Sequence, residues 1–440
     1  MRKLHPSCLL LAALLISSAA AQAQGVRLSA VLDMALESDA QFGAALAAAD
    51  GARERLPQAL AGTRPSISLS ANTRRNRDGS TAYNDTLSYV AESAAINYSQ
   101  PLFRLGIKAN VEQAEALERL ADQQLAFARQ DLLMRVARAY FDVLQAADEL
   151  TTAGAQKDAL TQQLAQTRRG FEVGTVPITD VNEAQARHDI AIAQQIVALN
   201  ELESRKRILE RSIVRPLPPL ARLKDSASAE LLSAAEIREL VGLAPRSALS
   251  VLIARAQVAV AEKEIAKREA GHHATLDLVG SVSASRNVNV GQFGGNNTRQ
   301  ASIGFEFGFP IYQGGVISSR TREAMADRRR AEHELAQAER QATLDAQQAQ
   351  LGVQSGIALT SALRQALIST ESQLRSSVRG QQVGIRTRVD VLNAEQQVFA
   401  TRRDLAVARY RTLVAALQLK AAAGLLTEAD LRGLDGLLAD

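Results

Sequence analysis

The sequence has almost no cysteine and few aromatic residues, and these two shortages exclude several classes of protein. Its single cysteine, Cys8, lies inside a predicted secretory signal and has no lipobox around it. The mature chain would therefore have no disulfide, no thiol nucleophile and no acylated cysteine. Aromatic residues make up only 4% of the 440 residues, and tryptophan is absent. The abundant alanine and glutamine are typical of long helices packed closely side by side.

A strong charge imbalance and a long apolar helix are missing as well. Removal of Arg2 and Lys3 with the signal would leave 49 of the 51 basic residues against 47 acidic ones. That balance is not the charge footprint of a nucleic-acid-binding protein. No later segment has the roughly 18 consecutive apolar residues of a transmembrane helix.

No motif for catalysis or for a cofactor appears in the chain. There is no phosphate-binding loop, no metal-ligand spacing and no Ser/His/Asp arrangement. His272 and His273 are adjacent, so on a strand they cannot face the same way and hold one metal ion. The sequence therefore predicts a protein that is not an enzyme and that uses no cofactor or metal.

The first residues predict export from the cytoplasm. A basic start is followed by an apolar stretch from Cys8 to Ile16 and by the small-residue cleavage site Ala21-Gln22-Ala23. This is the pattern of a signal peptide over residues 1–23, too short to remain as a membrane anchor.

The clearest pattern in the rest of the chain is an internal duplication. The stretch Val173–Ala184 matches Val383–Ala394, 210 positions later, without a gap. The identical pairs are Val173/Val383, Gly174/Gly384, Asp180/Asp390, Val181/Val391 and Ala184/Ala394. In both copies a glycine-centred break lies between two long helical patterns. Gly174 and Gly384 are therefore predicted to be helix-end turn residues with positive φ.

Two pairs of segments alternate polar and apolar residues with the period of a β-strand. The first pair covers Pro65–Asn72 and Leu87–Tyr98, where Glu92 interrupts the apolar face. The second pair covers Leu276–Ala284 and Ile303–Phe309. We interpret four aromatic residues as a lipid-facing and interfacial set, with a buried core strand as the alternative. They are Phe305, Phe307, Phe309 and Tyr312.

Each β-hairpin leads into a long helical pattern without proline. The two patterns begin near Leu105 and Val316 and run for about 65 residues, a rod of roughly 100 Å at 1.5 Å per residue. Each then reaches one of the duplicated turns and returns as a second helix. The predicted organisation is a signal peptide (1–23), a first repeat (24–214), a linker or equatorial segment (215–245), a second repeat (246–423) and a C-terminal equatorial segment (424–440).

The predicted strands have the length of tilted strands that cross a bilayer. A sheet in lipid cannot leave its edges unpaired, so it has to close into a barrel. Four strands cannot close, since bacterial barrels begin at about eight strands. Of the shared barrels, an eight-stranded dimer would pack almost solid, whereas a twelve-stranded trimer leaves a lumen. The predicted fold class is therefore mixed α and β, with long helical hairpins below a trimeric barrel in the bacterial outer membrane.

Three separated motifs resemble TolC and its relatives, the outer-membrane efflux and secretion channels. The motifs are Gly271–Leu278, Pro310–Gly315 and Val383–Ala394, in the family's order, and the resemblance covers essentially the whole mature chain. It implies a homotrimer with a twelve-stranded transmembrane β-barrel and a long periplasmic α-barrel. It also implies recruitment by an inner-membrane pump, of the RND or ABC type, and by a periplasmic adaptor protein.

The resemblance assigns a constriction at the periplasmic entrance to the second turn. Asp390 matches the first position of the family's acidic ring and Asn393 the second, although the family usually has Asp there. Three copies of Asp390 near one axis would repel one another and attract cations. The alternative is that Asp390 and Asp180 are helix caps, which is a common role of Asp at a helix start.

The resemblance also implies a latch between neighbouring hairpins. Arg386 matches the family's latch residue, and Thr179 and Asp180 match its acceptors. Gln381 stands where the family has an assisting Tyr, so that contact would be weaker or absent. The alternative is that Arg386 is an ordinary solvated arginine. In similar members the tips at Gly174 and Gly384 meet the adaptor.

Two function classes remain open from the sequence. The first is a trimeric outer-membrane channel that serves as the passive exit duct of an efflux pump or of a type I secretion system. The second is a periplasmic or surface coiled-coil scaffold, with the β segments as a cap.

Overall fold

The structure, a computed structural model, describes residues 25–80, 85–224, 232–288 and 296–439. The predicted signal peptide lies outside these residues. The chain divides into two compact units. One contains the described parts of residues 1–45, 126–251 and 338–440, and the other contains residues 46–125 and 252–337.

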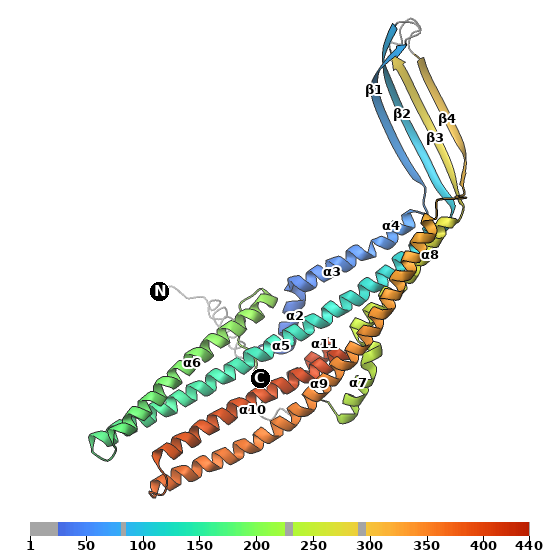
Figure 1. The fold of residues 1–440 in the computed structure, drawn as a ribbon. Helices are drawn as coiled ribbons and strands as arrows, with labels where there is room; N and C mark the ends of the chain where they lie inside the picture. The colour runs from blue at the N-terminus through green and yellow to red at the C-terminus, as the bar shows by residue number, and fades with distance from the viewer. Residues whose placement is uncertain (1–24, 81–84, 225–231, 289–295, 440) are drawn as a thin grey trace, which may run out of the picture. The chain divides into compact units, whose positions relative to one another are not determined.

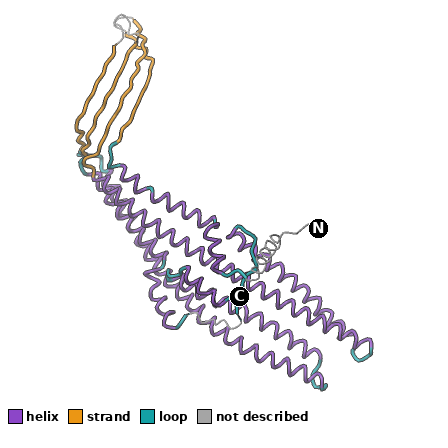
Figure 2. Tube along the Cα trace, turned by 180° about the vertical axis from the view of Figure 1, so that it is seen from behind, coloured by secondary structure: helices purple, strands orange, loops and turns teal. Residues whose placement is uncertain are grey.

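Most of the chain is helical, as Figures 1 and 2 show. The two patterns without proline are single helices, α5 (Leu105–Glu172) of 68 residues and α9 (Val316–Gln382) of 67 residues. Each continues through a turn into a return helix, α6 (Ile178–Ile213) or α10 (Arg388–Ala422). The remaining helices are α2 (Leu28–Ser38), α3 (Ala40–Arg53), α4 (Arg55–Ala61), α7 (Ala234–Ser247), α8 (Leu249–Glu269) and α11 (Glu428–Leu434), with short 3₁₀ turns η1 (Ala270–His272) and η3 (Asp435–Leu437).

Two further details of the helices concern Pro57 and the predicted linker. The sequence predicts one helical stretch up to about Ala61 with a bend or break marked by Pro57, and the structure has this break: α3 ends at Arg53, and Pro57 lies in the first turn of α4, where its missing N–H has no helical partner to lose. Helix α7 lies largely within the predicted linker 215–245. Among the described residues, no helix is long and apolar enough to cross a membrane.

The four strands form one antiparallel sheet in the order β1–β2–β3–β4. Their bounds are β1 (Ser66–Ser80), β2 (Asp85–Arg104), β3 (Thr275–Val288) and β4 (Asn296–Gly308). The two hairpins, separated by about 170 residues of sequence, therefore pair directly through β2 and β3. At the base of this pair Arg104 Nε donates to the buried Asp277 carboxylate at 2.8 and 3.1 Å.

The register gives the sheet one apolar and one polar face. One row across the sheet consists of Leu69, Ile96, Val282 and Ala301. The adjacent row points the other way and consists of Ser68, Asn97, Ser281 and Ser302. We call the side that carries the first row the apolar face. The predicted two-fold alternation is therefore present on all four strands.

The apolar face is open to its surroundings. Ile303 is 80% exposed, Phe305 71% and Phe307 69%. The alternative interpretation of Phe305, Phe307, Phe309 and Tyr312 as a buried core strand is therefore wrong for the single chain, because none of the described elements covers them. An exposed apolar area of this kind marks an interaction with lipid or with another protein.

Three aromatic residues of the helical part, Tyr140, Phe141 and Tyr410, lie together on α5 and α10. The rings of Tyr140 and Phe141 meet edge to face at 5.8 Å, and Phe141 lies 6.2 Å from Tyr410. The Tyr140 hydroxyl lies 3.1 Å from the carbonyls of both Val26 and Ala221, and it ties two otherwise extended segments to α5. The Tyr410 hydroxyl donates to Asp148 at 2.7 Å. Burial, with the nearby Asp148 charge, raises the pKa of Tyr410, so it stays a protonated donor.

We expect Tyr140→Phe to lower the free energy of unfolding of this helical unit by about 1–2 kcal/mol, because a buried carbonyl loses its donor while the ring packing is kept. Guanidinium unfolding followed by circular dichroism measures the change. Tyr312→Phe, at an 86% exposed residue, is the control. Equal midpoints for Tyr140→Phe and the native chain would contradict the prediction.

Candidate functional site

The two duplicated turns adopt the same backbone structure. Gly174 and Gly384 have φ values of 74° and 76°, as predicted for helix-end glycines. In the first turn Thr175 N donates to Gly170 O at 2.8 Å, and in the second Ile385 N donates to Gly380 O at the same distance. This six-to-one bond around a left-handed residue is a Schellman motif, which satisfies the carbonyls at the end of α5 and of α9.

Each turn contains a second glycine whose close contact the sequence analysis did not predict. A Cβ on Gly170 would lie 2.6 Å from Val176 Cγ2, and one on Gly380 would lie 2.7 Å from Arg386 Cγ. The chain therefore folds back onto the helix at this point, and only glycine leaves room for it. The signal was present in the sequence, since Gly170 and Gly380 are also 210 positions apart.

The two duplicated aspartates have different local roles. Asp390 completes a capping box with Thr387: Asp390 N donates to Thr387 Oγ1 at 3.2 Å, and Thr387 N donates to Asp390 Oδ2 at 2.9 Å. The position equivalent to Thr387 is Pro177, which has no side-chain acceptor. Asp180 N donates instead to the Pro177 carbonyl at 3.2 Å. The capping alternative thus holds for Asp390 and is wrong for Asp180.

The capping bonds also keep Asp390 ionised. Hydrogen bonds from the Thr387 N–H and hydroxyl, together with the nearby Arg386 charge, lower the pKa of the Asp390 carboxyl. In a single chain Asp390 is thus a fixed negative charge at neutral pH. It lies in the first turn of α10, where the helix dipole also favours an anion.

The predicted latch residues are not joined within one chain. Among the described residues, the exposed Arg386 side chain has no hydrogen-bond or ion-pair partner. Thr179 lies at the exposed start of α6 and Gln381 is half-buried at the end of α9. A bond from Arg386 to Thr179 or Asp180 of a neighbouring chain therefore stays a prediction.

Two other side-chain bonds join the second turn to the first hairpin. Arg388 Nη1 donates to Thr167 Oγ1 of α5 at 2.8 Å, and Thr167 is fully buried. Arg187 of α6 donates to Asn393 Oδ1 at 3.1 Å while it also pairs with Glu183 at 2.8 Å. The sequence interpretation had assigned no role to Arg388 and no partner to Asn393.

A small apolar contact lies beside these bonds. Leu160, Ala191 and Leu392 from α5, α6 and α10 pack together. A cavity of about 110 Å³ adjoins them and is lined in part by Glu395 and Phe399. Burial raises the pKa of the Glu395 carboxyl. No group of three or more metal-ligating side chains occurs among the described residues.

Comparison with known proteins identifies similar chains along almost the whole length. The family model for "outer membrane efflux protein" matches residues 31–213 and 240–425. The two matched segments begin 209 positions apart (240 minus 31), which agrees with the spacing of the duplicated turns.

Individual relatives match over the same extent. The chain is 33% identical over 406 residues to outer membrane protein TolC of Vibrio cholerae, covering 92% of each chain. It is 30% identical to the proteases secretion protein PrtF of Dickeya chrysanthemi, covering 97% of this chain and 94% of PrtF. Its fold matches the crystal structure of the MtrE outer membrane channel of Neisseria gonorrhoeae with a TM-score of 0.72 and 19% identity, over 91% and 90% of the two chains.

The capping difference predicts unequal stability of the two turns. We expect Thr387→Ala to speed amide exchange about fivefold at the start of α10, as is usual when an N-cap is lost. Asn182→Ala, at an exposed residue of α6 outside any capping bond and outside the predicted latch, should leave the start of α6 unchanged. Hydrogen-exchange mass spectrometry of peptides from both turns measures this. Equal responses to the two substitutions would show that the capping box does not hold the second turn.

Proposed function

Because this chain belongs to the outer membrane efflux protein family, we propose that it forms the passive exit duct of a tripartite efflux pump or of a type I secretion system. It is an outer-membrane channel of the TolC type, and its family is a family of transport channels. One observation carries this function, the sheet with one exposed apolar face and one polar face. A periplasmic scaffold would have no use for such a sheet and is not supported.

We propose that three chains share one twelve-stranded barrel. In a single chain β1 and β4 are edge strands with free backbone groups, and lipid tolerates no such edge. Pairing of β4 with β1 of the next chain satisfies both edges at once. The polar face, with its serines and Asn97, then lines the lumen. The same three-fold arrangement places three copies of each helical hairpin in one periplasmic α-barrel.

We propose that the second turn closes the periplasmic entrance. Asp390 would give a ring of three charges, and mutual repulsion would act against the local bonds that lower its pKa. Asn393 adds no charge, and its carbonyl is already bonded to Arg187. The entrance of this chain is therefore expected to select cations less strongly than an entrance with two acidic rings.

Arg386 is the proposed latch between chains, with Thr179 and Asp180 of the neighbouring hairpin as acceptors and Gln381 as a weak auxiliary. Its lack of a hydrogen-bond or ion-pair partner among the described residues of the single chain supports this role. An arginine–carboxylate bond is charge-assisted, yet it can be exchanged when a partner protein offers a substitute.

The partner proteins are proposed from the family and from the tips themselves. Apolar side chains are exposed at both tips, with Val173 73%, Val383 69% and Ile385 80% exposed. Such residues beside Gly174 and Gly384 suit a contact with a periplasmic adaptor. The adaptor would join the channel to an inner-membrane pump of the RND or ABC type.

Purified protein in detergent tests the function directly. We expect heat-modifiable trimers on electrophoresis and discrete conductance steps in planar bilayers. A monomeric, non-conducting protein would end the channel hypothesis.

The constriction predicts that Asp390 governs block by multivalent cations. Because Asp390 also caps α10, Asp390→Asn is the sharper substitution, since it removes the charge but keeps a capping oxygen. We expect its half-blocking concentration of a trivalent cation to rise at least tenfold, and Asp390→Ala should behave alike. Asp158→Asn, at an exposed carboxylate of α5 outside the proposed constriction and latch, is the control. Unchanged block in Asp390→Asn would remove Asp390 from the constriction.

The latch predicts that Arg386→Ser raises single-channel conductance, because the closed entrance loses a bond between chains. Bilayer recordings at fixed salt measure it. Arg375→Ser, at an exposed arginine of α9, should keep the native conductance. If both variants conduct like the native channel, Arg386 is only a solvated arginine.

A further inference from the structure

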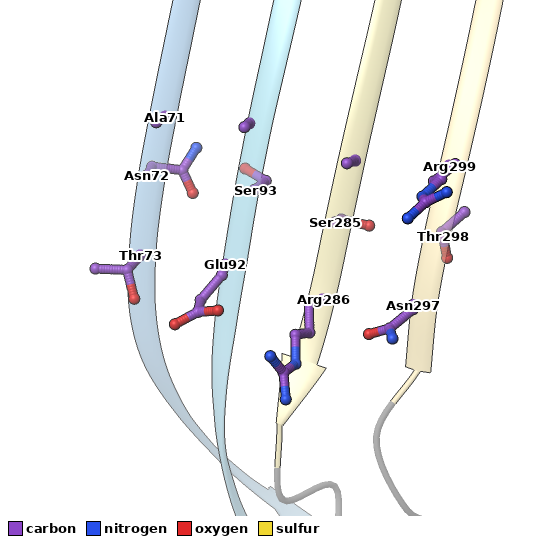
Figure 3. Close-up of a pocket in the computed structure, with 12 residues that line it drawn as sticks. Ala71, Asn72, Thr73, Glu92, Ser93, Ser285, Arg286, Asn297, Thr298 and Arg299 are labelled. Atoms are coloured by element: carbon purple, nitrogen blue, oxygen red, sulfur yellow. The ribbon is translucent and has the colours of Figure 1, made fainter.

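The loop end of the apolar face carries a cluster of arginines that the channel function does not use. The register places Thr73, Glu92, Arg286 and Asn297 in one row across the sheet (Figure 3). The next row toward the helices ends in Arg299, and the row on the loop side begins with Arg75. Since alternate rows share a face, these arginines lie on the same side as Leu69, Val282 and Phe305.

These arginines have no side-chain partner in the described part of the chain. Arg75, Arg286 and Arg299 are all exposed, and among the described residues none of them has a hydrogen bond or an ion pair. Glu92 is directly opposite Arg286 and is the one acidic residue in these rows. The cluster therefore keeps an excess positive charge on a face that is otherwise apolar.

The height of the cluster matches the edge of a membrane. From Leu276 to Arg286 there are ten steps along β3, about 33 Å at 3.3 Å per residue. A tilt of about 40° reduces this to roughly 25 Å, the height of the apolar band of an outer-membrane barrel. Arg286 thus lies at the level of the lipid head groups, where a guanidinium on the lipid side costs little.

The opposite edge of the same face is different. Phe307 and Leu276 form its last paired row before Phe309 and Tyr312, so that end is apolar and aromatic. The two ends of this face therefore suit lipid head groups of different charge: the arginine end suits anionic head groups, and the aromatic end has no such preference. Under the proposed channel function, on which this step rests, the loop end faces the outer leaflet and the helix end faces the inner one.

We propose that this arginine cluster, Arg75, Arg286 and Arg299, binds the phosphate groups of the phosphorylated glycolipid in the outer leaflet. Arginine pairs with phosphate through two parallel N–H donors. Arg286 and Arg299 are diagonal neighbours on adjacent strands, about 7–8 Å apart at the backbone, which lets both reach one phosphate. Closure of the barrel would pair β4, which carries Arg299, with β1 of the next chain, which carries Arg75, and repeat the cluster around the trimer.

The chain contains a matched control for this proposal. Arg74 adjoins Arg75 in β1 but pairs with Ala91 and therefore points to the polar face. Arg74→Gln removes the same charge at the same height without touching the lipid side. A difference between the two positions cannot come from net charge alone.

Native mass spectrometry of delipidated, full-length trimers titrated with bisphosphorylated lipid A tests the proposal. We expect the triple variant Arg75→Gln, Arg286→Gln, Arg299→Gln to bind at least tenfold more weakly than the native protein. Arg74→Gln should bind like the native protein, and dephosphorylated lipid A should bind weakly to all of them. If the triple variant does not assemble, the single variants Arg299→Gln and Arg286→Lys replace it. Each loses the paired N–H donors of one guanidinium and should bind lipid A severalfold more weakly.

Three results would overturn the proposal. They are native-like binding by the substituted proteins, an equal loss in Arg74→Gln, and equal binding of dephosphorylated lipid A. Conductance of the same samples separates this outcome from failure of the channel function. A conducting triple variant that has lost lipid A supports the cluster, whereas a native protein that neither forms trimers nor conducts refutes the channel instead.

Discussion

Closure of the sheet is the constraint on which the rest of the molecule depends. A four-stranded sheet with an exposed apolar face and two free edges is unstable in water, and its edges are intolerable in lipid. Under the proposed shared barrel, the partners of the two edge strands come from other copies of the chain. Helix α5 begins at Leu105, directly after the last residue of β2, so the chain passes from the sheet into the helix without a linker. Each helical hairpin therefore follows one of the two paired β-hairpins along the chain.

Duplication supplied two equal turns, and a few substitutions made them unequal. The backbone bonds around Gly174 and Gly384 are the same in both. The first turn has Pro177 and Ile178 where the second has Thr387 and Arg388, and only the second gains a capping box and a bond to the other hairpin. The second turn therefore has both the capping box and more charged side chains than the first, namely Arg386, Arg388 and Asp390. Such divergence suits a part that must hold its shape while it moves.

The sequence allowed the elements to be predicted but not their contacts. Long runs at a period of 3.6 residues, alternation at a period of two and a glycine at positive φ are local signals, and all of them appear in the structure. The bonds Arg388–Thr167 and Arg187–Asn393 join residues 221 and 206 positions apart. A local sequence pattern therefore cannot predict them. Neither the sequence patterns nor the structure of a single chain can show the proposed Arg386 latch, because its acceptors would belong to another chain.

These contacts also suggest how the entrance could open without unfolding. The capping box of Asp390 lies entirely within the second turn and moves with it. The bonds from Arg388 and Arg187 cross to the first hairpin, so a displacement of α10 has to exchange them. The Arg187–Asn393 bond is exposed to water, whereas the Arg388–Thr167 bond ends on a fully buried hydroxyl, and each contributes about 1–3 kcal/mol net because its donor is charged. A partner that contacts the tips can supply that much, so the closed state needs to be only slightly favoured.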